Sequence, residues 1–125
     1  MGKLIRNPYR LVPVKTINGY MYIDYKQIIL CEAKGKQTRI YTVEQPLGIH
    51  FESALAEIEK LLPAPLFFRC HRSRIINLGY LSEFTRYDRT IQLVEKIKVV
   101  ISEDRIPEFL RRTNPMMRQF DDLKI

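Results

Sequence analysis

Residues 67–78 read FFRCHRSRIINL, a stretch that places three arginines and a histidine between two apolar ends. On one continuous strand alternate residues share a face, so phenylalanine and charged side chains would lie on the same side. Neither face would be apolar throughout. The sequence therefore predicts a buried strand that ends near Cys70, an irregular turn through His71 to Ser73 that carries charge outward, and a second apolar stretch from Ile75 to Leu78.

The composition is that of one globular domain with a core. Of 125 residues, 46% are hydrophobic and 28% are charged. Lys and Arg total 21 against 14 acids, which gives a net charge of +7 and favours a polyanionic partner. Cys31 and Cys70 lack the spacing of a zinc site, so we expect two buried thiols and no metal or cofactor. No apolar run could span a membrane, and we expect a cytoplasmic protein without a membrane partner.

The first third of the chain predicts an arm followed by strands. Residues 1–10 are basic and irregular, and we interpret them as an N-terminal arm. Leu11–Ile17 predicts a strand, joined to another that begins at Tyr20 by a two-residue Asn18-Gly19 turn in which both positions tolerate positive φ. Ile28–Cys31 is apolar throughout, which suits a buried strand.

The middle of the chain predicts a hairpin and then a helix. A polar turn centred on Lys34-Gly35-Lys36 precedes a strand at Thr38–Val43, which gives a hairpin with a cationic tip. The period then changes, because the apolar residues of Phe51–Leu62 recur at helical spacing. We expect one short amphipathic helix there, with Ser53 as its N-cap and Pro63 beyond its end.

The remainder predicts further strands and a second helix. Cap-like residues after Ile101, and Pro107 at an early helical position, indicate a short C-terminal helix. We place a domain at residues 11–112 and a C-terminal tail at residues 113–125. Strands are expected at Tyr80–Arg86, Thr90–Val94 and Ile97–Ile101.

The opening stretch resembles the signature of the LytTR DNA-binding domain, the output module of many bacterial response regulators. That signature runs aromatic, Arg, any residue, His, Arg or Lys, Ser, then apolar residues and Asn. The resemblance extends more weakly from about Tyr20 to Leu110. It implies a mainly β fold, an elongated arrangement of small antiparallel sheets with one short amphipathic helix and a short C-terminal helix, which reads DNA with loops rather than with a recognition helix.

Catalytic chemistry has little support in the residues. The chain has two histidines, and it lacks a nucleophile elbow, a glycine-rich phosphate loop and a His-Glu-x-x-His motif. Adjacent residues on an extended chain point apart, which argues against a Cys70–His71 nucleophile pair. We therefore expect no catalytic residue and no enzyme activity.

Basic residues, in contrast, gather at the predicted loop tips. The planar fork of arginine can grip a phosphate or pair with guanine, whereas lysine acts mainly as a point charge. Any single one of these side chains is better explained as a solvated surface charge, but the clusters as a group favour nucleic acid. The clusters are Lys34, Lys36 and Arg39, then Arg69, Arg72 and Arg74, then Arg86 and Arg89.

The resemblance implies roles for individual residues. In the family, the segment that matches residues 69–73 lies against DNA, so we assign Arg72 a base-edge or phosphate contact. Arg69, His71 and Ser73 would contact the DNA backbone or support the turn. Asn77 matches the family's Asn, and its expected role is to hold backbone by side-chain hydrogen bonds.

Two other segments bear on the DNA contacts that the resemblance implies. A loop after the first long strand falls near residues 36–39, with Thr38 about where some members have a base-reading side chain. After the last strand the family usually carries an Arg that enters the major groove, but this chain has Ser102-Glu103-Asp104-Arg105. Two acids near a phosphate would repel it. Either Arg105 takes over the contact with the acids turned to solvent, or the DNA preference differs from the family's.

The sequence also lacks the receiver domain through which a response regulator is phosphorylated. Nothing before Leu11 could form a receiver domain, so we expect either a stand-alone regulator or a fragment.

The sequence thus favours a sequence-specific transcriptional regulator that binds double-stranded DNA. The resemblance implies tandem direct repeats bound by two copies, as a homodimer that forms on the DNA. Two alternatives stay open: a basic β-rich protein-interaction module that has lost specific DNA binding, which the Glu103-Asp104 departure favours, and single-stranded or RNA binding, in which Tyr80 and Tyr87 would stack on bases. The residues expected at DNA are Arg69, His71, Arg72, Ser73, Arg74, Lys36, Thr38, Arg39, Arg86, Arg89 and Arg105.

Overall fold

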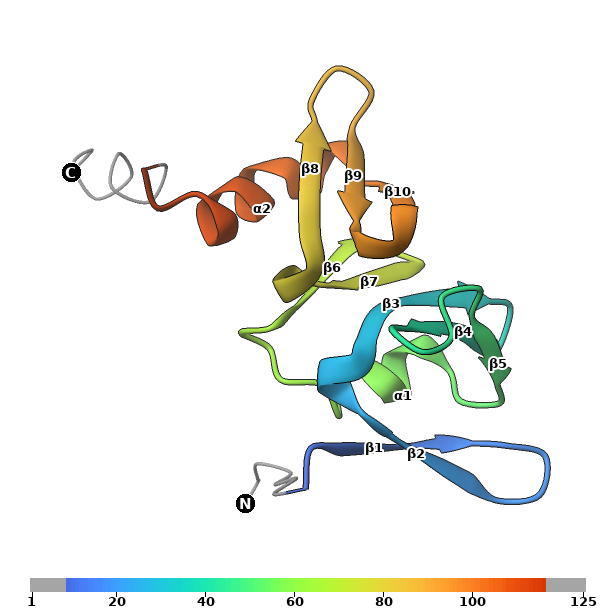
Figure 1. The fold of residues 1–125 in the computed structure, drawn as a ribbon. Coiled ribbons are helices and arrows are strands. Elements are labelled where there is room, and N and C mark those ends of the chain that lie inside the picture. Colours follow the sequence, from blue (N-terminus) through green and yellow to red (C-terminus); the bar gives the residue numbers. More distant parts are fainter. Residues whose placement is uncertain (1–8, 117–125) are drawn as a thin grey trace.

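The computed structural model describes residues 9–116, which form three antiparallel sheets and two helices (Figure 1). The predicted mainly β fold is confirmed. Its strands are β1 (Leu11–Lys15), β2 (Tyr20–Asp24), β3 (Ile28–Lys34), β4 (Gln37–Thr42), β5 (Ile49–Phe51), β6 (Phe67–His71), β7 (Arg74–Asn77), β8 (Leu81–Thr85), β9 (Thr90–Leu93) and β10 (Lys98–Val100). The helices are α1 (Leu55–Glu59) and α2 (Ile106–Thr113), with short 3-10 helices at Tyr25–Gln27, Leu78–Tyr80, Val94–Lys96 and Glu103–Arg105.

The three sheets follow one another along the molecule. Strands β1 and β2 form a two-stranded sheet, the central sheet has the order β5-β4-β3-β7-β6, and the third has the order β10-β9-β8. In Figure 1 the β1–β2 hairpin lies at one end and the β8–β9 hairpin projects from the other. The arrangement is elongated, with the central sheet between the two smaller ones.

The central sheet is buried on both faces, which explains its apolar pairs. Neighbouring residues of a strand point to opposite faces. Phe67 and Ile75 accordingly pack in one core with the β1–β2 hairpin and α1, whereas Phe68 and Ile76 pack in a second core with the β8–β10 sheet and α2. A strand covered on both sides reads as a continuous apolar run, as Ile28–Cys31 does.

Residues 67–78 fold as a hairpin with an irregular connection. Strand β6 pairs with β7 antiparallel, and the register skips Cys70, since Arg69 lies opposite Ile75 and His71 opposite Arg74. Such a bulge bends a strand and turns its side chains to new directions. Only two residues, Arg72 and Ser73, remain outside the strands.

The first hairpin differs from its prediction. Lys15 pairs with Tyr20, so the connection has four residues, 16–19, rather than two. The Thr16 N–H donates to the Gly19 carbonyl at 2.8 Å. Among the described glycines, only Gly35 and Gly48 have positive φ. The predicted Asn18-Gly19 turn of positive φ is therefore wrong.

The predicted helix over Phe51–Leu62 is too long. Phe51 belongs to edge strand β5, and α1 spans only Leu55–Glu59. Ser53 is not the N-cap, because its Oγ accepts the Lys15 N–H at 2.9 Å and so joins this segment to β1. Ala54 stands at the cap position instead.

Both cysteines are buried free thiols, as predicted. Burial raises the pKa of Cys31 and of Cys70 to about 12. The predicted arm (residues 1–10) and tail (residues 113–125) lie outside the described residues except at positions 9–10 and 113–116. Within residues 9–116, no helix is long and apolar enough to cross a membrane.

Candidate nucleic-acid interface

Three loops meet at one edge of the molecule, and we call them the three-loop edge: residues 34–37, 71–74 and 102–105. The Ala33 N–H donates to the Ser73 carbonyl at 2.8 Å, which joins the first loop to the second. The Ser102 N–H donates to the Cys70 carbonyl at 2.9 Å, which joins the third loop to the second. These two backbone hydrogen bonds therefore fix the relative positions of the loops.

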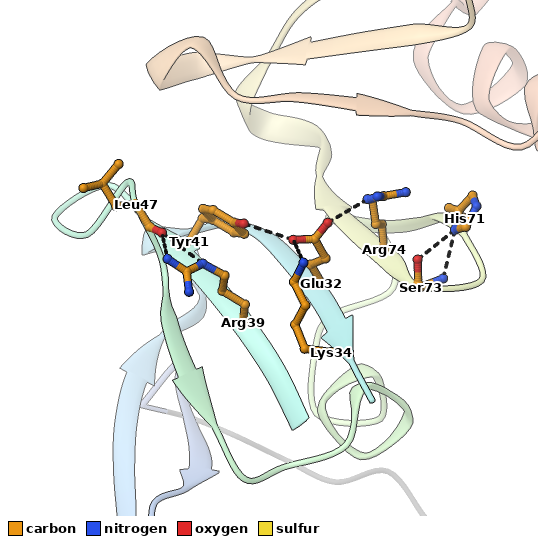
Figure 2. Close-up of polar contacts among 8 residues, drawn as sticks. All are labelled: Glu32, Lys34, Arg39, Tyr41, Leu47, His71, Ser73 and Arg74. Atoms are coloured by element: carbon orange, nitrogen blue, oxygen red, sulfur yellow. Dashed lines mark hydrogen bonds and ion pairs between the residues drawn. The ribbon is translucent and has the colours of Figure 1, made fainter. Parts of the chain in front are cut away.

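The turn between β6 and β7 is locked by its own side chains (Figure 2). The Ser73 N–H donates to Nδ1 of His71 at 3.1 Å, and Oγ of Ser73 lies 2.9 Å from the same nitrogen. A backbone N–H can only donate, so Nδ1 must be unprotonated and a neutral ring carries its proton on Nε2. Partial burial and the charges of Arg74 and Arg72 lower the pKa of His71, which favours this neutral form.

Arg72 is the exposed residue of this turn. Its side chain forms no hydrogen bond or ion pair within the part of the chain that the structure describes, while its carbonyl accepts a hydrogen bond from Nη2 of Arg69. A second nitrogen of Arg69, Nη1, lies 2.6 Å from Oε1 of Glu59 on α1. Arg69 thus links the turn to α1, and Arg72 presents its guanidinium to solvent.

A cluster of polar side chains around the carboxylate of Glu32 fixes the cations beside the turn (Figure 2). Oε2 of Glu32 accepts Nε of Arg74 at 3.0 Å, and Oε1 accepts the hydroxyl of Tyr41 at 3.0 Å and lies 3.5 Å from Nζ of Lys34. Burial opposes ionisation of Glu32, but the hydrogen bonds from Tyr41 and Arg74, with the charge of Lys34, outweigh it and lower the pKa of the carboxyl. Glu32 therefore stays charged and holds Arg74 against β3.

Arg39 is held away from this cluster. Its Nε and Nη2 donate to the carbonyl of Leu47, the former at 3.0 Å, and its guanidinium lies 5.6 Å from the centroid of the Tyr41 ring. Gly48 has φ of 84°, and a Cβ there would come within 2.7 Å of Nε of Arg39. The loop of residues 43–48 is thus shaped to receive this arginine.

Thr38 needs a correction. It is fully buried, and its hydroxyl donates to the Ser53 carbonyl at 2.8 Å. Alternation along β4 puts Thr38 on the same face as buried Ile40, toward the core. It presents no surface to DNA, so the structure contradicts the predicted contact.

The third loop carries Arg105 and the two acids. Nε of Arg105 donates to the Arg69 carbonyl at 3.0 Å, and its guanidinium lies 4.7 Å from the centroid of the Phe68 ring. Glu103 and Asp104 are exposed, and Oε1 of Glu103 lies 3.5 Å from Nη1 of Arg89. Arg105 is therefore partly committed to the fold, while the acids face solvent.

The remaining predicted residues divide into an exposed group and a structural one. Lys36 is exposed at the β3–β4 connection, beside the turn that carries Arg72. Arg86 is exposed on the β8–β9 connection, which projects away from the body of the molecule, so the structure does not bring it to the three-loop edge (Figure 1). Asn77 is buried, with Nδ2 donating to the Ile28 carbonyl at 2.9 Å and Oδ1 accepting the Gly79 N–H at 2.8 Å.

Sequence reasoning missed the acidic partners of the arginines. Glu32 and Glu59 each hold one arginine of the β6–β7 hairpin, yet they are 42 and 10 residues away along the chain from Arg74 and Arg69. A charged residue directly after the apolar run that ends at Cys31 was the one available signal for Glu32. No periodicity pairs it with a particular arginine.

Comparisons with known proteins agree with this geometry. Residues 18–114 match the family model of the LytTr DNA-binding domain. The heme-containing CO-sensing transcriptional regulators RcoM 2 and RcoM 1 of Paraburkholderia xenovorans (strain LB400) are each 30% identical to this chain, over 110 and 105 residues. These matches cover 83% and 79% of this chain but only 40% and 39% of the relatives, so the chain spans about 40% of their length.

A solved structure is similar as well. The LytTr DNA-binding domain of a Bacillus cereus protein, described as a methyl-accepting/DNA response regulator, matches with a TM-score of 0.69 and 27% identity. The match covers 84% of this chain and 97% of that one. The transcriptional regulatory protein NatR of Bacillus subtilis (strain 168) is 34% identical over 67 residues, which are 54% of this chain and 28% of NatR.

Proposed function

The chain belongs to the LytTr DNA-binding domain family, and from this premise we propose that it binds double-stranded DNA sequence-specifically and regulates transcription. The family is one of DNA-binding domains rather than of enzymes, and the curated relatives are transcriptional regulators. We propose residues 11–112 as the binding domain, close to the matched residues 18–114.

The observation that carries the proposal is the three-loop edge itself. It presents exposed Lys36 and Arg72 from connections that hydrogen bonds hold in place. Because the backbone of these connections is already held in place, less of it has to be ordered on binding, and the exposed side chains are free to reach a base edge or a phosphate. We propose Arg72 as the reading residue, and Lys36 as a phosphate contact.

Three tethered residues have a different proposed role. Arg69, His71 and Ser73 shape the turn that carries Arg72, and Nε2–H of the neutral His71 ring remains a donor for a phosphate oxygen. Arg74 and Arg39 are bound to Glu32 and Leu47, so they would add positive potential more than direct contacts. Arg86 lies on the projecting part of the β8–β9 connection and would meet only a flanking phosphate, whereas Arg89 is paired with Glu103 of the third loop and would add positive potential there.

Arg105 sits beside this turn and contributes in a similar way. Its Nε is used by the Arg69 carbonyl, so only its Nη atoms are left for DNA. We propose that it reaches a phosphate rather than a base.

The last part of the proposal concerns the number of copies of the protein on the DNA. We propose that two copies bind tandem direct repeats and pair on the DNA. If each copy contacts six to ten phosphates, affinity falls by roughly three to five decades between about 50 mM and 200 mM salt.

Selection from a pool of randomised duplexes tests the proposal. The protein, an Arg72→Ala variant and an Arg111→Ala control are each incubated with the pool at moderate salt, and the retained DNA is sequenced. Arg111 is a matched control because it is an exposed arginine of α2 paired with Glu108 at 2.9 Å. We expect a repeated motif that Arg111→Ala retains and Arg72→Ala loses, and retention without any motif would contradict sequence-specific reading.

One observation favours a second candidate function, a protein-interaction module. Glu103 and Asp104 are exposed at the three-loop edge, where they would repel phosphates. If neither randomised duplex nor genomic DNA is retained at low salt, this candidate replaces the first.

A further inference from the structure

A small pocket lies beside the three-loop edge, between α1, β6 and α2. Arg69, Arg105 and Arg112 line it together with Glu59, over an apolar floor that includes Phe68. Arg105 and Arg69 also line the neighbouring hollow that contains the β6–β7 turn. The pocket therefore shares Arg69 and Arg105 with the proposed DNA-binding surface but does not include Arg72.

Two of the three arginines, Arg105 and Arg112, lie over the Phe68 ring. The guanidinium carbons of Arg105 and Arg112 lie 4.7 Å and 5.5 Å from its centroid. Arg112 donates to the carbonyls of Phe67 at 3.1 Å and Ala64 at 2.6 Å. A side chain that is already held in position loses little conformational entropy when a ligand binds.

The pocket has an excess of positive charge and an unused donor. Three guanidinium groups face one carboxylate, that of Glu59, which lies 2.6 Å from Nη1 of Arg69. Nε of Arg69 is buried and has no hydrogen-bond partner among the described residues. A buried donor left without an acceptor is costly, so an acceptor group at this place would stabilise the fold.

We propose that this pocket binds a small oxyanion, such as inorganic phosphate or a short-chain carboxylate, through the guanidinium groups of Arg69, Arg105 and Arg112 that line it. Arginine donors and oxyanion acceptors form charge-assisted hydrogen bonds, which are stronger than the bonds that Arg105 and Arg112 now make to backbone carbonyls. The oxyanion can be a free anion or a phosphate of bound DNA. Only the second source rests on the proposed function.

Titration of the DNA-free protein with phosphate tests the free-anion source. The ¹H–¹⁵N resonance of Arg69 Nε is followed against chloride at equal ionic strength, in the protein, in Arg112→Gln and in Arg111→Gln. We expect a saturable shift that Arg111→Gln retains and Arg112→Gln weakens at least tenfold. Acetate should compete with phosphate for the same resonance.

A Glu59→Gln variant keeps the test decisive if Arg112→Gln does not fold. Removal of the only carboxylate should tighten phosphate binding several-fold, a gain that loss of structure cannot produce. A linear shift without saturation, or an equal response in Arg111→Gln and Arg112→Gln, would overturn the free-anion site.

The DNA source has its own measurement. If a DNA phosphate occupies the pocket, Arg112→Gln lowers duplex affinity and phosphate competes with duplex more strongly than chloride does at equal ionic strength. If duplex binds but neither effect occurs, the pocket does not hold DNA, and the proposed function still stands. If no phosphate shift and neither DNA effect is seen, the proposal fails.

Discussion

Two arginine-bearing hairpins, β6–β7 and β8–β9, look alike in sequence and differ in how firmly they hold their cations. In β6–β7 every residue of the connection is tied, through His71 Nδ1, the Ser73 carbonyl or the Arg72 carbonyl. In β8–β9 the connection projects from the molecule, and the Tyr87 side chain on it is 96% exposed (Figure 1). The backbone around Arg72 is thus bonded to β3 and to Arg69, whereas, among the described residues, the Arg86 carbonyl is bonded only to the Arg89 N–H of its own hairpin, and Arg89 at the base of that connection is joined to Ile101 and Glu103.

The difference comes from the position of each hairpin in the fold. Strands β6 and β7 belong to the sheet that is buried on both faces, so neighbouring elements supply hydrogen-bond partners. Strands β6 and β8 are both edge strands, but the sheet of β8 packs against one core only. Arginine count alone does not separate these two hairpins, and we propose that the tethered backbone marks the one that reads DNA.

The largest expected effect on stability concerns the anchor of the first hairpin. Asn77→Ala removes the side-chain partner of the Ile28 carbonyl, in a buried bond, and of the Gly79 N–H, in a partly buried one, and this should cost about 1–3 kcal/mol of unfolding free energy. Thr85→Ala on β8 serves as the control and should change it by less than about 0.5 kcal/mol. Urea unfolding measures both, and equal losses would show that the two hairpins are anchored alike.

An effect of similar size, on DNA binding, is expected for the exposed arginine of the same hairpin. Arg72→Ala should weaken binding to the selected duplex by about 1–3 kcal/mol, because a contact fixed by the turn is lost. Fluorescence anisotropy gives the affinity, and circular dichroism verifies that the fold persists, as expected for an exposed side chain. An unchanged affinity would remove Arg72 from the reading surface.

Thr38 separates burial from DNA contact. Thr38→Val keeps the shape and removes the hydroxyl that donates to Ser53, so we expect a loss of about 1 kcal/mol in stability and no change in DNA affinity. Thermal unfolding and anisotropy on one sample test both. A tenfold loss of affinity without loss of stability would restore the contact that the structure contradicts.

The pH dependence of the turn is a subtler test. The pKa of His71 is lowered from its ordinary value of 6.5, so the folded state favours the neutral ring. The stability that this ring contributes is present above pH 6.5 and is lost as pH falls from 6.5 toward the lowered pKa of the folded state. An NMR titration of the imidazole should give a value below 6.5, and Arg72→Gln should raise it, since one repelling charge is removed.

A titration of His71 at or above 6.5 in the free protein would contradict the partly buried ring beside Arg74 and Arg72. The turn would then be looser than described. The contrast with the β8–β9 connection would be correspondingly smaller.

The fold could be predicted from sequence where local pattern decides it. The apolar run Ile28–Cys31, the Gly35 turn and the interruption at His71 each report on backbone conformation near themselves. The helix over Phe51–Leu62 was too long because helical spacing alone cannot show that Phe51 pairs with Thr38 across β5 and β4. That pairing joins residues 13 positions apart in the sequence, and local spacing does not reveal it.

The candidate site was harder to predict for the same reason. Exposure of Arg72 follows from its place in a turn, but the capture of Arg74 by Glu32 depends on the pairing of β3 with β7. Thr38 was misjudged although a signal existed, since it stands two residues from Ile40 and shares its inward face. The sequence identifies the basic residues, but it does not show which of their side chains are bound within the fold and which are exposed to solvent.

The most direct test of the account is the ratio of affinities for the selected duplex and for a scrambled duplex, measured over a range of salt for the protein, Arg72→Ala and Arg86→Ala. If the fixed hairpin reads sequence, Arg72→Ala lowers this ratio by roughly tenfold or more. Arg86→Ala should weaken both duplexes alike, by a few-fold, and reduce the salt slope by about 1. An unchanged ratio in Arg72→Ala, or an equal loss of ratio in both variants, would contradict it.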